Sequence, residues 1–188
     1  WETISRQSNV KIFVFFCCEE MQRDAEKVML RLDTGERLSA RLVVAADGAQ
    51  SWVRGQTGIQ ATFTPYHEKG VVTNFRCSGN HDATAFQWFN HDGIVALLPL
   101  ANGAVSLVWS APDAKADELM QLDEQAFARR VEEVSDGVVG SLELLTPRAA
   151  FPLRLMRVDS VIAERVALIG DAAHAIHPLS GHGINLGF

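Results

Sequence analysis

The sequence predicts an α+β region, built on an antiparallel or mixed sheet with helices to one side, attached to the edge of an α/β region. Segments that alternate between apolar and polar residues, separated by short polar turns, fill residues 70–110, as expected for antiparallel strands. A helical spacing of apolar residues follows at residues 113–135. Two continuous apolar runs, at residues 42–46 and 166–169, each predict a buried strand that ends in a turn carrying an aspartate, and the second run is typical of a parallel strand.

Length, composition and charge are those of a globular protein. The 188 residues are 47% hydrophobic and 21% charged, which is enough apolar material to bury a core. The net charge of −6 argues against nucleic acid as a partner, because phosphate binding requires a basic face. Cys17, Cys18 and Cys77 lack metal-binding spacing and predict reduced thiols. Since no apolar run approaches the roughly 20 residues that cross a bilayer and no signal peptide is recognisable, we expect a cytoplasmic location.

The first third of the chain predicts a strand, a hairpin and a short helix. Residues 9–18 form a continuous apolar run rich in Val, Ile and Phe, which predicts a buried strand. Residues 27–48 alternate, turn at residues 33–36 and alternate again, which predicts a hairpin whose second arm ends in the apolar run 42–46. Residues 49–59 predict a short helix that ends at a glycine.

Strands and one helical stretch make up the middle of the chain. Asp113 and Asp123 are the predicted helix caps in the stretch 113–135. Residues 141–155 then return to strand character. The four strands that precede the helical stretch, predicted to form an antiparallel meander, are residues 70–78, 84–90, 93–100 and 104–110.

The C-terminal segment begins with a strand that ends at a candidate binding site. Val166 to Ile169 predict a parallel strand, and Gly170 and Asp171 follow at its carboxyl end, where open α/β sheets bind ligands. An aspartate at this position can accept hydrogen bonds from a ribose or ribityl hydroxyl. Residues 172–176 predict a helical turn that Pro178 ends.

A glycine-rich stretch, residues 181–187, completes this segment. Its glycines allow a backbone to approach a ligand closely, and its last residues predict the opening of a helix, whose N-terminus stabilises negative charge. Three other interpretations stay open. The glycines resemble a dinucleotide fingerprint, although they do not directly follow a strand. Asp171, His174 and His177 are spaced as in some metal sites, but no fourth ligand is evident and we predict no metal. A capped turn with structural glycines is the third interpretation.

A second cluster repeats this pattern nearer the N-terminus. The apolar run 42–46 ends in a turn that carries Asp47 and Gly48, and Ser51 and Arg54 follow on the next helical turns. Arg54 is suited either to face a phosphate or to pair with Asp47. Taken by itself, the cluster also fits an ordinary strand-to-helix connection.

Both clusters resemble motifs of one family. ADGAQSWVR, residues 46–54, resembles the DG motif of flavin-dependent aromatic hydroxylases related to p-hydroxybenzoate hydroxylase. LIGDAAHAIHPLSGHGINLGF, residues 168–188, is similar to their GD motif and the flavin-contacting segment after it. Three further stretches are similar to the ubiquinone-biosynthesis hydroxylases of that family: QWFNHDGIVALLPL (87–100), SLVWS (106–110) and AAFPLR (149–154).

The resemblance implies a division of the chain into domains. Residues 1–59 and 158–188 would belong to a Rossmann-like FAD-binding domain, and residues 60–157 would form a substrate-binding sheet domain. Family members begin with a strand, a GxGxxG turn and a helix that have no counterpart here, and they continue beyond the equivalent of Phe188. We therefore expect the chain to be an internal fragment of such an enzyme.

The resemblance also implies roles for individual residues. Gly170 and Asp171 would hold the ribityl chain of FAD, with the Asp171 carboxylate accepting its hydrogen bonds. Asp47 and Gly48 would help to join the FAD and NAD(P)H sites, and Arg54 would also bind the cofactor.

The remaining implied roles fall at the end of the chain. Pro178, the one implied catalytic residue, would lie near the face of the flavin where oxygen adds. A stretch of backbone would lie along the flavin ring and stabilise charge on it. This stretch comprises Gly181, His182, Gly183, Ile184, Asn185 and Leu186, with His182 in place of the glutamine usual in the family.

The implied activity is hydroxylation of an aromatic ring with FAD as cofactor and NAD(P)H and O2 as co-substrates. The implied substrate is a small molecule, a polyprenyl phenol or benzoquinol of ubiquinone biosynthesis. Peripheral contact with a membrane or a biosynthetic complex, and oligomerisation, stay open. The alternatives are a non-catalytic ligand-binding domain, or a halogenase or reductase on the same scaffold.

Overall fold

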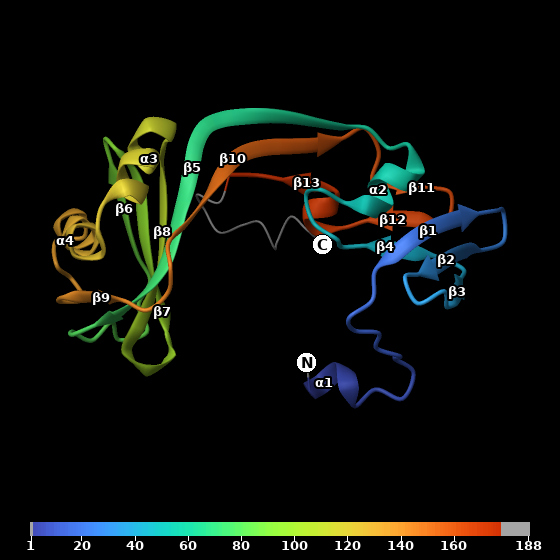
Figure 1. Ribbon diagram of the computed structural model, residues 1–188, viewed down its shortest axis with the longest axis horizontal. Coiled ribbons are helices and arrows are strands. Elements are labelled where there is room, and N and C mark those ends of the chain that lie inside the picture. The colour runs from blue at the N-terminus through green and yellow to red at the C-terminus, as the bar shows by residue number, and fades with distance from the viewer. Residues whose placement is uncertain (1, 178–188) are drawn as a thin grey trace. The chain divides into compact units, whose positions relative to one another are not determined.

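The computed structural model describes residues 2–177, which divide into two units (Figure 1). We call residues 2–62 with 157–174 the N-terminal unit, and residues 63–156 with 175–177 the sheet unit. Two long strands, β5 (Ala61–Cys77) and β10 (Ala149–Val158), run from one unit into the other. Among the described residues, no helix combines the length and the apolar composition that crossing a bilayer requires.

The four predicted strands of the middle region are present and pair antiparallel, which confirms their positions. The sheet order is β6-β7-β8-β5, so β5 lies beside the last of the four strands and only β6, β7 and β8 form a meander. On the far side of β5 the sheet continues through β10 to the short β13, and β9 pairs with one end of β5. The bounds not yet given are β6 (Phe86–Asn90), β7 (Gly93–Leu100), β8 (Ala104–Pro112), β9 (Leu142–Leu144) and β13 (His174–Ala175).

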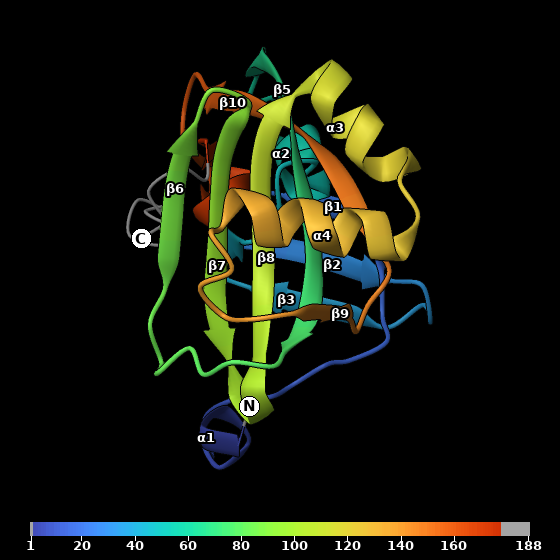
Figure 2. The same ribbon diagram turned by 90° about the vertical axis from the view of Figure 1, so that its left-hand side faces the viewer.

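Two helices, α3 (Asp113–Gln121) and α4 (Glu124–Val134), cover one face of this sheet (Figure 2). The predicted cap Asp123 is confirmed, because its carboxylate accepts a hydrogen bond from the Ala126 N–H at 2.7 Å. The predicted cap Asp113 is wrong. Pro112 occupies the cap position of α3 without a side-chain hydrogen bond, and Asp113 is the first helical residue.

The core lies between these helices and the sheet. Phe75 of β5 stacks on Phe127 of α4 with ring centroids 6.0 Å apart, and both rings are fully buried. The guanidinium of Arg148 lies over the Phe127 ring, 4.7 Å from its centroid. It donates to the Leu119 and Leu122 carbonyl oxygens at 2.8 and 2.6 Å, which satisfies backbone groups at the end of α3. The other large buried side chains of this core are Val71, Val95, Leu97, Val105, Leu107, Trp109, Leu119 and Val131.

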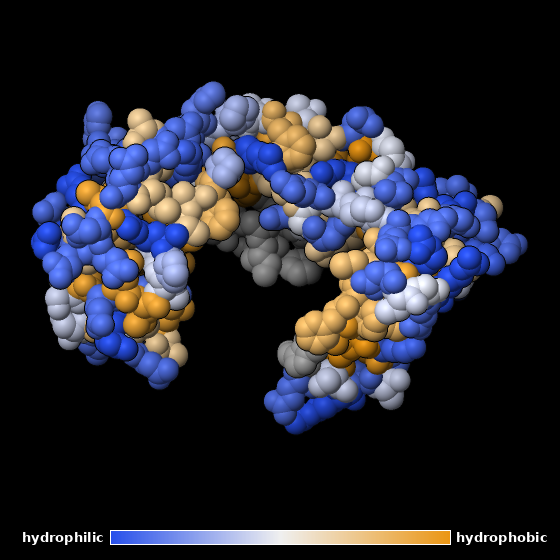
Figure 3. All heavy atoms as spheres, viewed as in Figure 1, coloured by the Kyte–Doolittle hydropathy of each residue, from blue (hydrophilic) through white to orange (hydrophobic). Residues whose placement is uncertain are grey.

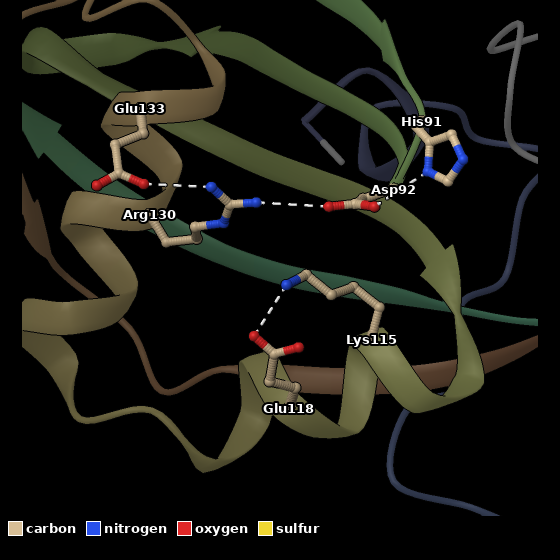
Figure 4. Close-up of polar contacts among 6 residues, drawn as sticks. All are labelled: His91, Asp92, Lys115, Glu118, Arg130 and Glu133. Atoms are coloured by element: carbon tan, nitrogen blue, oxygen red, sulfur yellow. Dashed lines mark hydrogen bonds and ion pairs between the residues drawn. The ribbon is translucent and has the colours of Figure 1, made fainter.

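Ion pairs at the surface fasten α4 to the sheet. Arg130 of α4 reaches Asp92, in the turn between β6 and β7, at 3.5 Å and Glu133 of its own helix at 3.2 Å (Figure 4). Asp92 also lies 3.4 Å from the ring of His91. Because these groups are only partly shielded from solvent, they orient the helix while the apolar core supplies most of the stability.

The N-terminal unit contains two small sheets. β1 (Cys18–Arg23), β2 (Val28–Leu32) and β3 (Arg37–Ala40) pair antiparallel, with the β2–β3 turn at residues 33–36 as predicted. The second arm of the hairpin differs from its prediction because the chain leaves this sheet after Ala40. The other sheet and the flanking helices comprise β4 (Val43–Ala45), β11 (Ile162–Ala163), β12 (Val166–Leu168), α1 (Glu2–Ser5) and α2 (Trp52–Thr57).

The strand predicted at residues 9–18 is wrong. Only Cys18 belongs to a strand, and the preceding apolar side chains reach the surface, with Phe15 fully exposed. Figure 3 shows apolar residues on the surface of this segment between α1 and β1. Apolar composition favours burial, but a strand also requires a neighbouring strand to accept its hydrogen bonds, and in the described residues β1 has only β2 beside it.

Gly93, at the start of β7, has a backbone that only glycine adopts without strain. Its φ is +123°, and an added Cβ would lie 2.0 Å from the carbonyl oxygen of Ser110. We expect Gly93→Ala to lower the free energy of unfolding of the sheet unit by about 3 kcal/mol, because the backbone strain and the clash add. Urea denaturation followed by tryptophan fluorescence measures this change.

The matched control is Gly55→Ala in α2, where no atom lies within 4 Å of an added Cβ. We expect this substitution to leave the free energy of unfolding unchanged or to raise it slightly, because alanine is the better helix former. Equal urea midpoints for the Gly93→Ala and Gly55→Ala chains would contradict the assignment.

Candidate functional site

The two aspartate turns follow strands that lie side by side. β4 and β12 pair in parallel, with Val43 opposite Val166 and Ala45 opposite Leu168, and the pairing continues as the Ile169 N–H donates to the Ala45 carbonyl oxygen at 2.9 Å. Because the carboxyl ends of neighbouring parallel strands meet at one edge of a sheet, the turns that carry Asp47 and Asp171 leave from the same edge. The parallel strand predicted at residues 166–169 is confirmed over residues 166–168.

The first turn connects β4 to α2. Gly48 has a φ of +85°, which favours glycine, and an added Cβ would meet no atom within 4 Å. Ser51 caps α2, with its hydroxyl accepting from the Arg54 N–H at 2.9 Å, and the exposed Asp47 carboxylate accepts from the Val53 N–H at 3.1 Å. The predicted short helix is confirmed, and it ends at Gly58 in the left-handed conformation.

The Arg54 side chain joins the two motif segments. It is 7% exposed, and its guanidinium donates to the Ala172 carbonyl oxygen at 2.8 Å and to the Ala49 carbonyl oxygen at 2.7 Å. Pairing with Asp47, one of the two alternatives for Arg54, is therefore wrong, because the guanidinium is directed to backbone carbonyls while the Asp47 carboxylate accepts from a backbone N–H. The other alternative, that Arg54 faces a phosphate, stays a prediction. A buried charge needs such hydrogen bonds to offset its loss of hydration.

The second turn follows β12. Gly170 has a φ of +56° and begins a single 3-10 turn that contains the exposed Asp171 and ends at Ala172, after which the chain enters β13. The helical turn predicted at residues 172–176 is wrong, because β13 pairs as a strand with its neighbour in the sheet. Asp171 and Gly170 nevertheless lie at the carboxyl end of the strand, where the sequence predicts them.

Several predicted site residues lie outside the described part of the chain. These are Pro178 and the glycine-rich stretch, Gly181, His182, Gly183, Ile184, Asn185 and Leu186. Their implied roles stay predictions.

The structure describes Asp171, His174 and His177, the three residues of the metal interpretation. Within residues 2–177, no three side chains of the His, Cys, Asp or Glu type are grouped to hold a metal ion. His177 instead lies 3.0 Å from Glu68, a contact between residues 109 positions apart that no local pattern indicates.

One cysteine has a perturbed pKa in the N-terminal unit. Partial burial raises the pKa of the Cys18 thiol, and neighbouring Cys17 and the carboxylates of Asp33 and Asp47 raise it further. A raised pKa lowers the thiolate fraction at neutral pH, so this thiol is a poor nucleophile.

The described residues fit an extended cofactor that carries hydroxyl groups. Asp47 and Asp171 present exposed carboxylates, which accept hydrogen bonds from hydroxyls, at one edge of a parallel strand pair. Gly48 and Gly170 leave open space where a Cβ would stand, so a ligand can approach the backbone in both turns. Of these four residues, Gly170 and Asp171 are the ones that could hold the ribityl part of FAD.

Loss of the Arg54 guanidinium should weaken the N-terminal unit. We expect Arg54→Met to lower the free energy of unfolding by about 2–4 kcal/mol, because the buried Ala172 carbonyl oxygen and the partly buried Ala49 carbonyl oxygen lose their donor. Arg54→Lys should recover only part of this loss, since one ammonium group cannot reproduce the guanidinium fork. Urea denaturation measures both changes, and exposed Arg41→Met is the control, expected within about 0.5 kcal/mol of the unmodified chain. Equal effects of Arg54→Met and Arg41→Met would contradict the role of Arg54.

The chain is similar in sequence to proteins whose names state a function. The chain is 33% identical over 190 residues to 3-demethoxyubiquinol 3-hydroxylase of Escherichia coli, covering all of this chain and 48% of that protein. It is 35% identical over 195 residues to the ubiquinone biosynthesis monooxygenase COQ6, mitochondrial, of Xenopus tropicalis, covering 86% of this chain and 42% of that protein. The chain thus spans less than half the length of either relative.

Solved structures share the fold. The crystal structure of PqsL, a probable FAD-dependent monooxygenase from Pseudomonas aeruginosa, is 26% identical with a TM-score of 0.78, covering 99% of this chain and 54% of that one. CmlS, a flavin-dependent halogenase, shares the fold at 20% identity and a TM-score of 0.72, covering 92% of this chain and 33% of that one.

A family model described as the FAD binding domain matches residues 17–188, which include both aspartate turns. The predicted combination of an antiparallel or mixed sheet region with part of an FAD-binding domain is confirmed by this match and by the fold shared with PqsL. The chain belongs to the FAD binding domain family.

Proposed function

We propose that the chain is part of an FAD-dependent monooxygenase that uses NAD(P)H and O2 to hydroxylate the ring of a polyprenyl phenol or benzoquinol in ubiquinone biosynthesis. The observation that carries the proposal is the pair of aspartate turns at one edge of β4 and β12, joined by buried Arg54. The names of the relatives, a ubiquinone biosynthesis monooxygenase and a 3-demethoxyubiquinol 3-hydroxylase, support the reaction and the substrate class.

The described residues would hold the cofactor and leave the redox chemistry to it. The Asp171 carboxylate would accept hydrogen bonds from ribityl hydroxyls, and the open backbone at Gly170 would let the chain lie close to them. Asp47 and Gly48 would help to join the FAD and NAD(P)H sites. Arg54 would act as a positioning residue, because it bonds backbone carbonyls in both motif segments. FAD, when bound, supplies electron transfer from NAD(P)H and the activation of O2.

The end of the chain would complete the site. We propose that the backbone of residues 181–186 lies along the flavin ring and that Pro178 lies by the ring face where oxygen adds. A backbone N–H stabilises charge on a ligand whatever its side chain, so His182 in place of the family's glutamine is compatible with this role.

An apolar strip on the face of the main sheet opposite α3 and α4 supports an uncharged, apolar substrate. Residues there alternate with the buried core residues, and Ala96 lies opposite Val108, which in turn lies opposite Val72. All three side chains are only half-buried, so they are available to contact a ligand. Apolar contacts of this kind favour a ring that carries a hydrocarbon chain over a charged benzoate, since none of them can pair with a carboxylate.

A non-catalytic ligand-binding domain and a halogenase or reductase on this scaffold are the alternatives that the experiment separates. The likeness to CmlS bears on the fold alone. A cytoplasmic location, contact with a membrane or a biosynthetic complex, and oligomerisation stay predictions.

The first test is an FAD titration, followed by flavin fluorescence, of this chain and of a completed form. In the completed form, the corresponding residues of the E. coli relative are added at both ends, because the chain spans less than half of that protein. We expect the completed form to bind FAD, and Asp171→Asn to weaken binding by about tenfold or more, because a charge-assisted hydrogen bond is lost. The control is Asp117→Asn, which removes an exposed carboxylate from α3 and should leave FAD affinity unchanged.

Turnover of the FAD-loaded completed form then separates the alternatives. NAD(P)H oxidation coupled to a hydroxylated polyprenyl phenol supports the monooxygenase. FAD binding without hydroxylation would overturn the monooxygenase in favour of the scaffold alternatives, and no FAD binding at all would favour a ligand-binding domain.

A further inference from the structure

Three side chains of the sheet unit, none of them part of the two aspartate turns, meet at one point. The Nε2 atom of His177 lies 3.0 Å from Oε2 of Glu68, and the ring of Tyr66 meets the His177 ring edge-on with centroids 5.1 Å apart. Tyr66 and Glu68 both belong to β5, whereas His177 follows β13 near the end of the described chain. The contact therefore fixes the chain after β13 to a strand of the main sheet.

Burial makes this contact stronger than an ordinary surface pair. The His177 side chain is 16% exposed and that of Glu68 is 38% exposed, so solvent screens the pair less than it screens the exposed pairs elsewhere on the sheet. Of the charged groups nearby on β5, Lys69 is engaged by Asp117 of α3 at 2.5 Å. Glu68 is thus left to interact with His177.

The backbone of β5 is unusual at this point. His67, between Tyr66 and Glu68, has a φ of 59°, which is left-handed and uncommon for a residue with a Cβ. Strain of this kind persists only where neighbouring contacts maintain it, and it often redirects side chains beside functional sites. Here both side chains that flank the strained residue contact the same imidazole ring.

We propose that Glu68 is a positioning residue for the flavin, acting through His177. The inference rests on the proposed function, in which the segment that follows His177 contacts FAD. A proline at position 178 restricts the residue before it, His177, to extended backbone. Because this restriction limits the directions the chain can take after His177, anchoring His177 to Glu68 sets the direction in which the chain enters the flavin-contacting segment.

A double-mutant cycle on the completed form tests this relationship through FAD affinity. We expect Glu68→Ala and His177→Ala each to weaken FAD binding by about tenfold, since small displacements of a binding segment are costly. If Glu68 acts through His177, the double variant should bind FAD no more weakly than either single variant. The control is Glu143→Ala, which removes an exposed glutamate that pairs with Arg76 on the same sheet and should leave FAD affinity unchanged.

A second measurement is independent of FAD. Glu68→Gln should shift the imidazole nitrogen resonances of His177 in the NMR spectrum of the chain, whereas Glu143→Gln should not. An unshifted His177 resonance would contradict the pairing on which the proposal depends.

The outcomes distinguish failure of the inference from failure of the proposed function. FAD binding by the unmodified completed form with an unaffected Glu68→Ala variant overturns the inference alone. Effects that multiply in the double variant, to about a hundredfold, also overturn it, because Glu68 would then act independently of His177. No FAD binding by the unmodified completed form overturns the proposed function, and the inference with it.

Discussion

The buried guanidinium of Arg54 is the interaction on which the candidate site depends. It donates to carbonyl oxygens in both motif segments, and one of these, Ala172, lies 118 residues away in the sequence. Arg54 is 7% exposed. Separating the two segments would leave its buried charge without hydrogen bonds, and the resulting desolvation penalty opposes that separation. The register of the parallel pair β4–β12 sets where each turn begins along the strands, and the hydrogen bonds of Arg54 join the two turns.

The two units supply different physical properties. The sheet unit has a continuous apolar core in which the rings of Phe75 and Phe127 stack, and the ion pairs on its surface add orientation more than stability. The N-terminal unit has a smaller buried cluster around β4 and β12, and its exposed aspartates lie at the edge of that cluster. An extended, hydroxyl-rich cofactor needs hydrogen-bond acceptors that are fixed in position and still accessible. The buried cluster fixes the turns that carry the exposed carboxylates of Asp47 and Asp171.

Local sequence patterns predicted much of the fold and of the aspartate site. The four antiparallel strands, the cap at Asp123, the helix end at Gly58 and the two aspartate turns each depend on residues within a few positions of one another. Two of the errors have a common physical cause. Within residues 2–177, the apolar segment before Cys18 lacks a neighbouring strand, and the residues after Asp171 enter a strand because the sheet offers one to pair with. In both cases the outcome depended on a partner distant in sequence, which periodicity does not report.

The sequence by itself determined the residue types at each turn and most of the segments that are strands or helices, because backbone conformation and side-chain alternation act over short distances. It also determined the family, through two motifs that are each continuous in the chain. Only the tertiary structure decided that Arg54 bonds the Ala172 carbonyl rather than Asp47, that β5 lies beside β8, and that Glu68 holds His177. These contacts join residues between about 30 and 118 positions apart, and they form only when the sheets assemble and remove the groups from water.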